Sequence, residues 1–247
     1  MPIAPLQVPR KPVVCYRDLQ VSLSSARIRA YSKDDDQDSD DAIARYMWNM
    51  AIGSALWPAL HVLEVTIRNA FYEVGASVAK NNPQPVNRVP CWLTSGLLLS
   101  REQDEVDKAL KRLVSGHEAI GHLIAELTFG FWVQLCNSPY EHGKSGTARI
   151  WPDAAIRFLG CPRHLRERRT IQRELNYAKD LRNTVAHHHP IWDRNPVRQL
   201  NEVVKILGWM NPGMAEAVRQ TSNVASVVAA GHQPFRPLAA AISSAAV

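Results

Sequence analysis

The sequence predicts an all-α fold, and two observations support this prediction. Apolar residues recur at steps of three and four in several long segments, which is the period of one helical face. None of these segments shows the strict alternation of polar and apolar residues that is typical of strands. A chain of 247 residues, of which 46% are hydrophobic, can bury a substantial core. We therefore expect one helical domain over residues 22–210, with an extended lead-in over 1–21 and an Ala- and Ser-rich tail over 211–247.

The N-terminal third predicts one dominant helix. Four prolines in residues 1–20 favour an extended segment, residues 23–31 predict a short helix, and the acidic patch at 34–41 predicts a loop that runs into the negatively charged start of the next helix. That helix is predicted over 41–78, where one apolar face repeats at helical spacing through Asn49, Gly53, Leu56, Leu60, Leu63, Ile67 and Phe71.

Composition indicates a soluble protein of the cytoplasm. The stretch from Ala51 to Ile67 is almost long enough to span a membrane, but it contains His61 and Glu64 and leads into Arg68. We interpret it as a buried helix and expect no membrane contact. The four cysteines form no CxxC pair and the N-terminus lacks the apolar core of a signal peptide, so a reducing cytoplasm is expected.

The remaining elements follow from periodicity and chain-breaking residues. Loops are expected over 81–90 and 137–146, and the tail after 211 is expected to begin as a helix. Ser100 is a candidate N-cap for its helix, and Trp151 and Pro152 are expected to open a short helix. The longer helices are predicted over 100–115, 118–136, 163–186 and 196–209.

The segment from Asp180 to Ile191 carries the most informative chemistry. On the helix predicted over 163–186, Arg182 falls on a stripe that is otherwise apolar and comprises Ile171, Leu175, Ala178 and Val185. A guanidinium in that position needs a carboxylate, carbonyl groups or a wet cleft. Asn183 and His187 are four residues apart and share a helical face, so the three polar side chains are expected to converge.

These three side chains suit attack by an RNA 2′-hydroxyl on the adjacent phosphate. His187 can move a proton near neutral pH, Arg182 can hold a phosphate and stabilise its developing charge, and Asn183 can position either one. This reaction needs no metal. The alternative is structural, with the histidine capping the end of the helix and the arginine in an ion pair.

The basic residues nearby predict RNA as the partner. The net charge is +6, and Arg163, Arg166, Arg169 and Arg173 would line one side of the same helix and track an RNA backbone. An ordinary solvated helix face would have the same pattern. Adjacent histidines at 187–189 rarely face one ion, and no Cys, Asp or Glu stands near them at ligand spacing, so we expect neither a metal nor another cofactor.

The segment RNTVAHHHPIW (182–192) resembles the RNxxAHH-P-I signature of the Abi-like proteins, a bacterial branch of the HEPN superfamily. Three further segments are similar to that family in the same order, namely YMWNMAIGSALWPALHVLEVTIRNAF (46–71), LTFGFWVQL (127–135) and IWPDAAIRFLG (150–160). The resemblance covers roughly residues 22–205. Two features depart from it: His189 stands where the family often has an acidic residue, and the tail after about 210 has no counterpart.

The resemblance implies a HEPN-like helical bundle that forms a homodimer, with the Arg-x4-His motifs of both subunits facing one cleft. It also implies a metal-independent endoribonuclease of anti-phage defence, acting by abortive infection or as a toxin, with an antitoxin or a phage component as a further partner. In this chain the motif runs from Arg182 to His187, and His188 is a second candidate for proton transfer. Cleavage would leave a 2′,3′-cyclic phosphate.

The family's E-x-x-x-RN pattern falls on Glu64, Arg68 and Asn69. We expect Glu64 to orient Arg182 or Arg68 beside the cleft, or else to form a buried structural ion pair. Three hypotheses for the whole chain remain: an RNase, a non-catalytic module that binds RNA or a phage component, and a structural interaction domain. The intact set of Arg182, Asn183 and His187 favours the RNase.

Overall fold

The computed structural model describes residues 22–32, 39–79, 91–113, 120–142, 149–151 and 153–236. Within these ranges the regular elements are all helices and no strand occurs, which confirms the predicted all-α class. The predicted lead-in, the acidic residues at 34–38, the loop at 81–90 and the last part of the tail lie outside the described residues.

The chain divides into two compact units, each assembled from separate stretches of sequence. Unit 1 takes the described residues up to Trp57, the stretch Thr184–Leu200 and the described residues from Ser222 onward. Unit 2 takes Pro58–Asn183 and Asn201–Thr221. The described part of the predicted tail contributes to both units.

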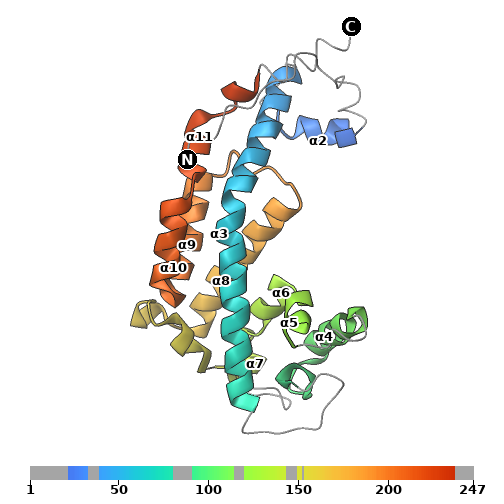
Figure 1. Cartoon of the computed structure of the whole chain (residues 1–247), viewed down its shortest axis with the longest axis vertical. Helices are drawn as coiled ribbons and strands as arrows, with labels where there is room; N and C mark the ends of the chain where they lie inside the picture. Colours follow the sequence, from blue (N-terminus) through green and yellow to red (C-terminus); the bar gives the residue numbers. More distant parts are fainter. Residues whose placement is uncertain are drawn as a thin grey trace. The chain divides into compact units, whose positions relative to one another are not determined.

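The longest helix, α3 (Ser39–Ala79), matches the helix predicted over 41–78 (Figure 1). It begins with Asp40 and Asp41, whose charges are favourable at a helix N-terminus. Its apolar face is buried as expected, at Ile52, Leu56, Leu60, Leu63, Ile67 and Phe71. By length and composition α3 is apolar enough to cross a membrane, but the core helix of a soluble protein meets the same two criteria. In α3, 33% of the most apolar window is buried.

Unit 1 joins the start of α3 to two short helical segments. Residues after α2 (Ser25–Arg29) place Tyr31 in a buried cluster with Ile28 and Ala42. From the C-terminal side, Phe235 in the η5 turn (Gln233–Phe235) packs against Ile43 and Ala44. Within α11 (Val224–Ala230), the carbonyl oxygen of Val227 accepts a 2.8 Å hydrogen bond from the Trp48 indole.

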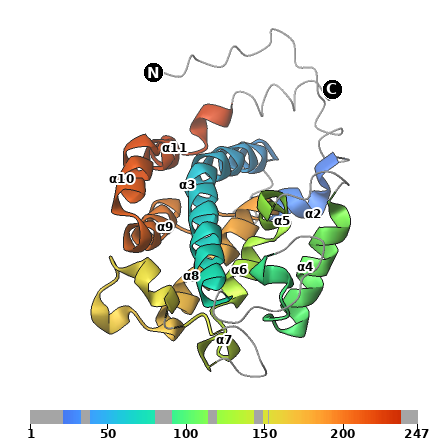
Figure 2. The same ribbon diagram turned by 60° about the horizontal axis from the view of Figure 1, so that its bottom comes forward.

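In unit 2, α4 (Ser100–Arg112) packs against the η1 turn (Trp92–Thr94), α5 (Ile120–Glu126) and α6 (Phe129–Gln134) (Figure 2). The core of the unit is aromatic and includes the fully buried Phe71, Phe129, Phe131, Trp132, Tyr140 and Phe158. The prediction of Ser100 as N-cap is wrong, because the cap position is Leu99 and Ser100 is already helical.

The helix predicted over 118–136 is interrupted at Leu127 and Thr128. The Thr128 hydroxyl accepts a hydrogen bond from the backbone N–H of Phe131, so it caps a new helix instead of continuing the previous one. The loop predicted over 137–146 contains a helical turn, α7 (Pro139–His142). The short helix expected after Trp151 is a 3-10 helix, η3 (Asp153–Phe158).

The prediction of a continuous helix from Arg163 is also wrong. A 3-10 turn, η4 (Arg163–Leu165), comes first, and α8 (Arg168–Ala186) begins five residues later than expected. The Arg166 guanidinium donates to the carbonyl oxygens of Leu159 at 2.6 Å and Cys161 at 2.7 Å, which holds the chain in a turn before α8. The next helix, α9 (Pro196–Met210), and α10 (Pro212–Thr221) fit the predicted positions.

Candidate functional site

An ion pair joins α3 to α8 within unit 2. The Arg182 Nε donates to Oε2 of Glu64 at 3.0 Å, and Arg182 Nη1 donates to the Asn183 side-chain oxygen at 3.3 Å. The two charged side chains are 30% and 21% exposed, so the pair is partly shielded from water. A guanidinium bound by a carboxylate keeps its planar head in one orientation. The structure thus brings together Glu64, Arg182 and Asn183.

Arg68 and Asn69, which follow Glu64 in α3, have environments that differ from that of Glu64. Arg68 lies one turn later, and its Nε is buried without a hydrogen-bond partner. Of the two partners expected for Glu64, the structure selects Arg182, which is 118 positions away in the chain. Asn69 is exposed. Glu64 therefore orients the arginine of the motif, while Arg68 is a half-buried cation on the same helix.

The end of α8 is closed by the histidines that follow it, in unit 1. The His188 N–H donates to the Val185 carbonyl at 3.0 Å and the His189 N–H to the Thr184 carbonyl at 2.9 Å. His188 has a φ of 56°, a left-handed conformation that costs a residue with a side chain about 1–2 kcal/mol. Arg27 donates to the His188 carbonyl at 3.0 Å. This turn stops the helix and projects the imidazoles of residues 187–189 from it.

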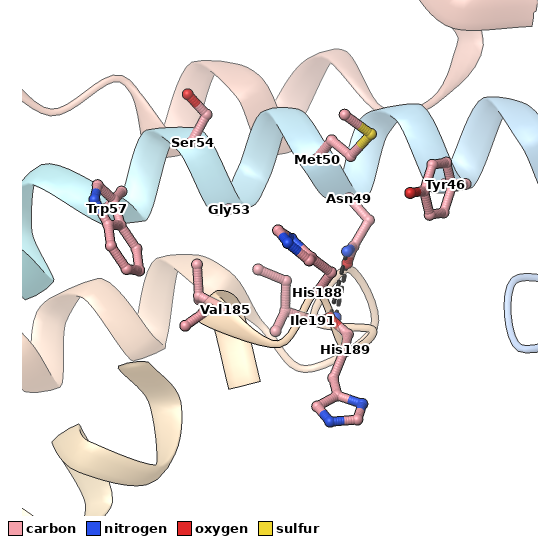
Figure 3. Close-up of a pocket in the computed structure, with 11 residues that line it drawn as sticks. Tyr46, Asn49, Met50, Gly53, Ser54, Trp57, Val185, His188, His189 and Ile191 are labelled. Atoms are coloured by element: carbon pink, nitrogen blue, oxygen red, sulfur yellow. Dashed lines mark hydrogen bonds between the residues drawn. The ribbon is translucent and has the colours of Figure 1, made fainter. Parts of the chain in front are cut away.

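The loop after α8, residues 187–192, is held by the buried side chain of Asn49 in α3 (Figure 3). Its amide oxygen accepts from the backbone N–H of Ile191 at 2.8 Å and of Trp192 at 3.1 Å. Its amide nitrogen donates to the Tyr31 hydroxyl at 3.2 Å and to the His189 carbonyl at 3.4 Å. We call residues 187–192 the histidine loop. Asn49 uses both its acceptor positions and both its N–H groups to fix this loop.

The motif residues belong to different units. Arg182, Asn183, Glu64, Arg68 and Asn69 are in unit 2, whereas His187 and His188 are in unit 1. His187 is exposed, and its ring centroid is 6.2 Å from that of His189. Within unit 1 the structure therefore places the His187 and His189 rings near each other, and within unit 2 it gathers the Glu64, Arg182 and Asn183 set.

A pocket of about 410 Å³ opens between the histidine loop and α3 (Figure 3). Trp57 is 42% exposed and Met50 is 52% exposed at this pocket, although both are large and apolar. Figure 3 shows the His188 imidazole extending toward the turn of α3 that contains Gly53, whereas the His189 imidazole points away from α3. The pocket is lined by Tyr46, Asn49, Met50, Gly53, Ser54, Trp57, Val185, Ala186, His188, His189 and Ile191.

The four arginines proposed to track RNA do not form one helical row. Arg163 and Arg166 precede α8, so they are not on its face. Arg166 is engaged by carbonyl oxygens and Arg173 donates to Glu174 at 3.0 Å. Arg163 and Arg169 are exposed. The helical row is a wrong prediction, because the chain turns at Arg166.

Some residues of the site were not singled out from the sequence. Asn49 interrupts the apolar stripe of α3, and a buried amide on such a stripe is a signal that it has specific hydrogen-bond partners. Arg168 is buried and donates to Glu141 at 2.6 Å and to the Cys136 carbonyl at 2.8 Å, which lowers the pKa of Glu141 below its ordinary value. Arg168 lies on the same helical stripe as Arg182, so position on that stripe alone does not separate this structural arginine from Arg182.

Among the residues described, no three side chains of His, Cys, Asp or Glu lie close enough together to hold a metal ion. Comparisons with models of protein families, with curated proteins and with solved structures found no match to this chain.

Proposed function

We propose that this protein is a metal-independent endoribonuclease of the HEPN type, and that Arg182, Asn183 and His187 carry its reaction. The observation that supports this most is the Glu64–Arg182–Asn183 set, in which an arginine of the motif is oriented by a carboxylate from another helix. A guanidinium held in this way is prepared for a phosphate oxygen. His187 follows five positions later and is exposed to solvent.

In this mechanism the RNA supplies its own nucleophile. One His187 accepts the proton of the 2′-hydroxyl, the 2′-oxygen attacks the adjacent phosphorus, and the bond from phosphorus to the 5′-oxygen breaks. A second acid protonates the departing 5′-oxygen, leaving a 2′,3′-cyclic phosphate and a 5′-hydroxyl. Arg182 stabilises the negative charge that develops on the phosphate, and Asn183 positions the guanidinium.

We propose a homodimer, because one acid and one base are needed and a second subunit would supply a second His187. His188 is the alternative proton donor. The proposed setting is the bacterial cytoplasm, in defence against phage, with an antitoxin or a phage component controlling the activity. Arg163 and Arg169, which are exposed, are the proposed contacts for the RNA backbone.

The test is cleavage of total RNA and of a matched DNA by the purified protein in the presence of EDTA. RNA should be cut to products with a 2′,3′-cyclic phosphate, whereas DNA should resist because it lacks the attacking hydroxyl. His187→Ala should lower the rate by about 10²–10⁴-fold, the usual contribution of a general acid or base. Arg182→Lys should lower it by about 10²-fold through loss of the planar contact to phosphate.

The matched control is His142→Ala, which removes an exposed imidazole of α7. It should cut RNA as the unaltered protein does. Cleavage that requires a divalent cation, or that persists in His187→Ala, would contradict the mechanism. A protein that binds RNA but never cuts it would be the non-catalytic module instead.

A further inference from the structure

The pocket beside the histidine loop has the features of a site for a flat aromatic ligand. We infer that it receives one unpaired nucleobase of the RNA. The inference rests on the proposed function, because it makes single-stranded RNA the substrate class of the same site. All the residues of the pocket belong to unit 1.

The shape of the pocket fits a base. Gly53 has no side chain, and the α3 backbone at this lining residue lies so close to Val185 and Ile191 that an added Cβ would already touch both. The Trp57 indole at the rim is exposed, and stacking on an aromatic ring is how unpaired bases are commonly held. A volume of about 410 Å³ is at the lower end of the range for small-ligand sites, and it admits a nucleoside.

The charges around the pocket favour a ligand attached to phosphates. None of its eleven lining residues is acidic, and two of them are histidines. Arg27 donates to the carbonyl oxygen of His188, one of these two histidines. No carboxylate of the lining therefore opposes an incoming polyanion.

Hydrogen-bonding groups at the pocket are available from a few side chains. Tyr46, Ser54 and His188 are lining residues with polar side chains, and Figure 3 shows the Ser54 hydroxyl turned away from the histidine loop. Asn49 also lines it, but its amide is already fully used by the histidine loop and by Tyr31. Stacking would therefore dominate over reading of the base edges, which predicts tolerance of base identity.

The pocket is close in the chain to the proposed proton carrier. His188 lines the pocket and directly follows His187. A base can enter only when it is unstacked and unpaired. We therefore expect cleavage of single strands and loops, and not of the interior of duplexes.

The first experiment uses a short single-stranded RNA that is 2′-O-methylated throughout, so that it binds without being cut. Its affinity for the unaltered full-length protein is measured by fluorescence anisotropy and compared with that of an abasic strand of equal length and charge. Removing the bases should weaken binding by about 10-fold, the order of one stacked base. Equal affinity for both strands would overturn the inference, and no variant is needed for this result.

The second experiment asks whether Trp57 and Gly53 account for the difference in affinity between the base-containing and the abasic strand. Trp57→Leu should remove the preference for the base-containing strand, whereas Trp57→Phe, which keeps an aromatic ring, should retain most of it. Gly53→Leu should fill the pocket and lower affinity about 10-fold. Gly121→Leu is its control, because a Cβ added at that exposed helical glycine meets nothing within 4 Å.

Two further outcomes separate this inference from the proposed function. Base-dependent binding by a protein that never cuts unmodified RNA would support the pocket and contradict the RNase. Cleavage of RNA by a protein that binds the base-containing and the abasic strand equally would support the RNase and contradict the pocket. If Trp57→Leu changes the sedimentation of the oligomer and leaves RNA affinity unchanged, the pocket is a contact surface for a second protein copy and the inference is overturned.

Discussion

Asn49 shows how one buried side chain can decide the position of a loop. A buried amide is favourable only when its donors and acceptors are satisfied, and Asn49 satisfies all of them with the histidine loop and Tyr31. Burial and the neighbouring Tyr46 raise the pKa of Tyr31 to about 12, so its hydroxyl remains protonated at physiological pH. The network therefore stays unchanged across the pH range in which a histidine titrates.

Replacing Asn49 by alanine should destabilise the protein. The N–H groups of Ile191 and Trp192 would lose their acceptor, and a free energy of unfolding lower by about 3 kcal/mol is expected. Chemical denaturation measures this difference. Ser54→Ala, one turn later and exposed, is the control and should change stability by less than about 0.5 kcal/mol. A loss for Asn49→Ala as small as the control's would show that water replaces the amide.

Among the helices, α3 contains two glycines whose replacement by alanine should change stability in opposite directions. Gly53 lines the pocket, where an added Cβ makes only ordinary contacts. Gly75 lies against the Trp92 indole, and a Cβ there would overlap the ring. Both positions are in the interior of the helix, where alanine is intrinsically preferred over glycine.

Gly53→Ala should therefore stabilise the protein by up to about 1 kcal/mol, the difference in helix propensity. Gly75→Ala should destabilise it by about 1–3 kcal/mol, because the buried indole must move in a packed core. Thermal unfolding of the two variants beside the unaltered protein gives both signs in one experiment. A stabilising Gly75→Ala would mean that η1 shifts without cost.

The start of α3 is tied to the C-terminal segment by Asp41. Its carboxylate accepts from Arg236 at 2.5 Å and from Arg45 at 3.1 Å, with the His232 ring nitrogen 3.5 Å away. Burial opposes ionisation, but these cations outweigh it and lower the pKa of Asp41 below its ordinary value. The ionised carboxylate therefore stabilises the folded chain.

Because the pKa of Asp41 is lowered on folding, its contribution is present above the ordinary carboxyl pKa of about 3.9 and is lost as the pH falls through the folded value. Asp41→Asn should remove this part of the acid sensitivity. Trp48 contacts the His232 ring and donates to Val227, so tryptophan fluorescence during an acid titration reports release of the segment. Glu167→Gln, at an exposed carboxylate, should titrate as the unaltered protein does.

For the molecule as a whole, the sequence could predict what depends on local periodicity. The helices α3 and α9 follow from apolar spacing, and so does the buried stripe of α8 from Ile171 to Val185. Periodicity also predicted that Arg182 needs a partner, and the family resemblance named Glu64 as a candidate; the 3.0 Å contact confirms this pairing. The break at Thr128 was missed because apolar residues continue on both sides of it.

The features that the sequence could not predict depend on contacts between distant segments. The turn before α8 requires the Arg166 guanidinium to reach back to two carbonyl oxygens, and no periodicity encodes that. Unit 1 is assembled from three stretches of the chain, so the pocket and the role of Asn49 become visible only when those stretches meet. An apolar stripe identifies a buried face but not the segment that covers it.

The separation in sequence between Asn49 and the residues that it binds also sets the time during synthesis at which these contacts can form. Ile191 is 142 positions downstream, so on a ribosome that adds about 5–20 residues per second the histidine loop meets its support on the order of 10 s after Asn49 is made. The ion pair from Asp41 to Arg236 closes later, because its two residues are 195 positions apart. If the chain cuts RNA, a nascent fragment that ends before the histidine loop is harmless to the message that encodes it.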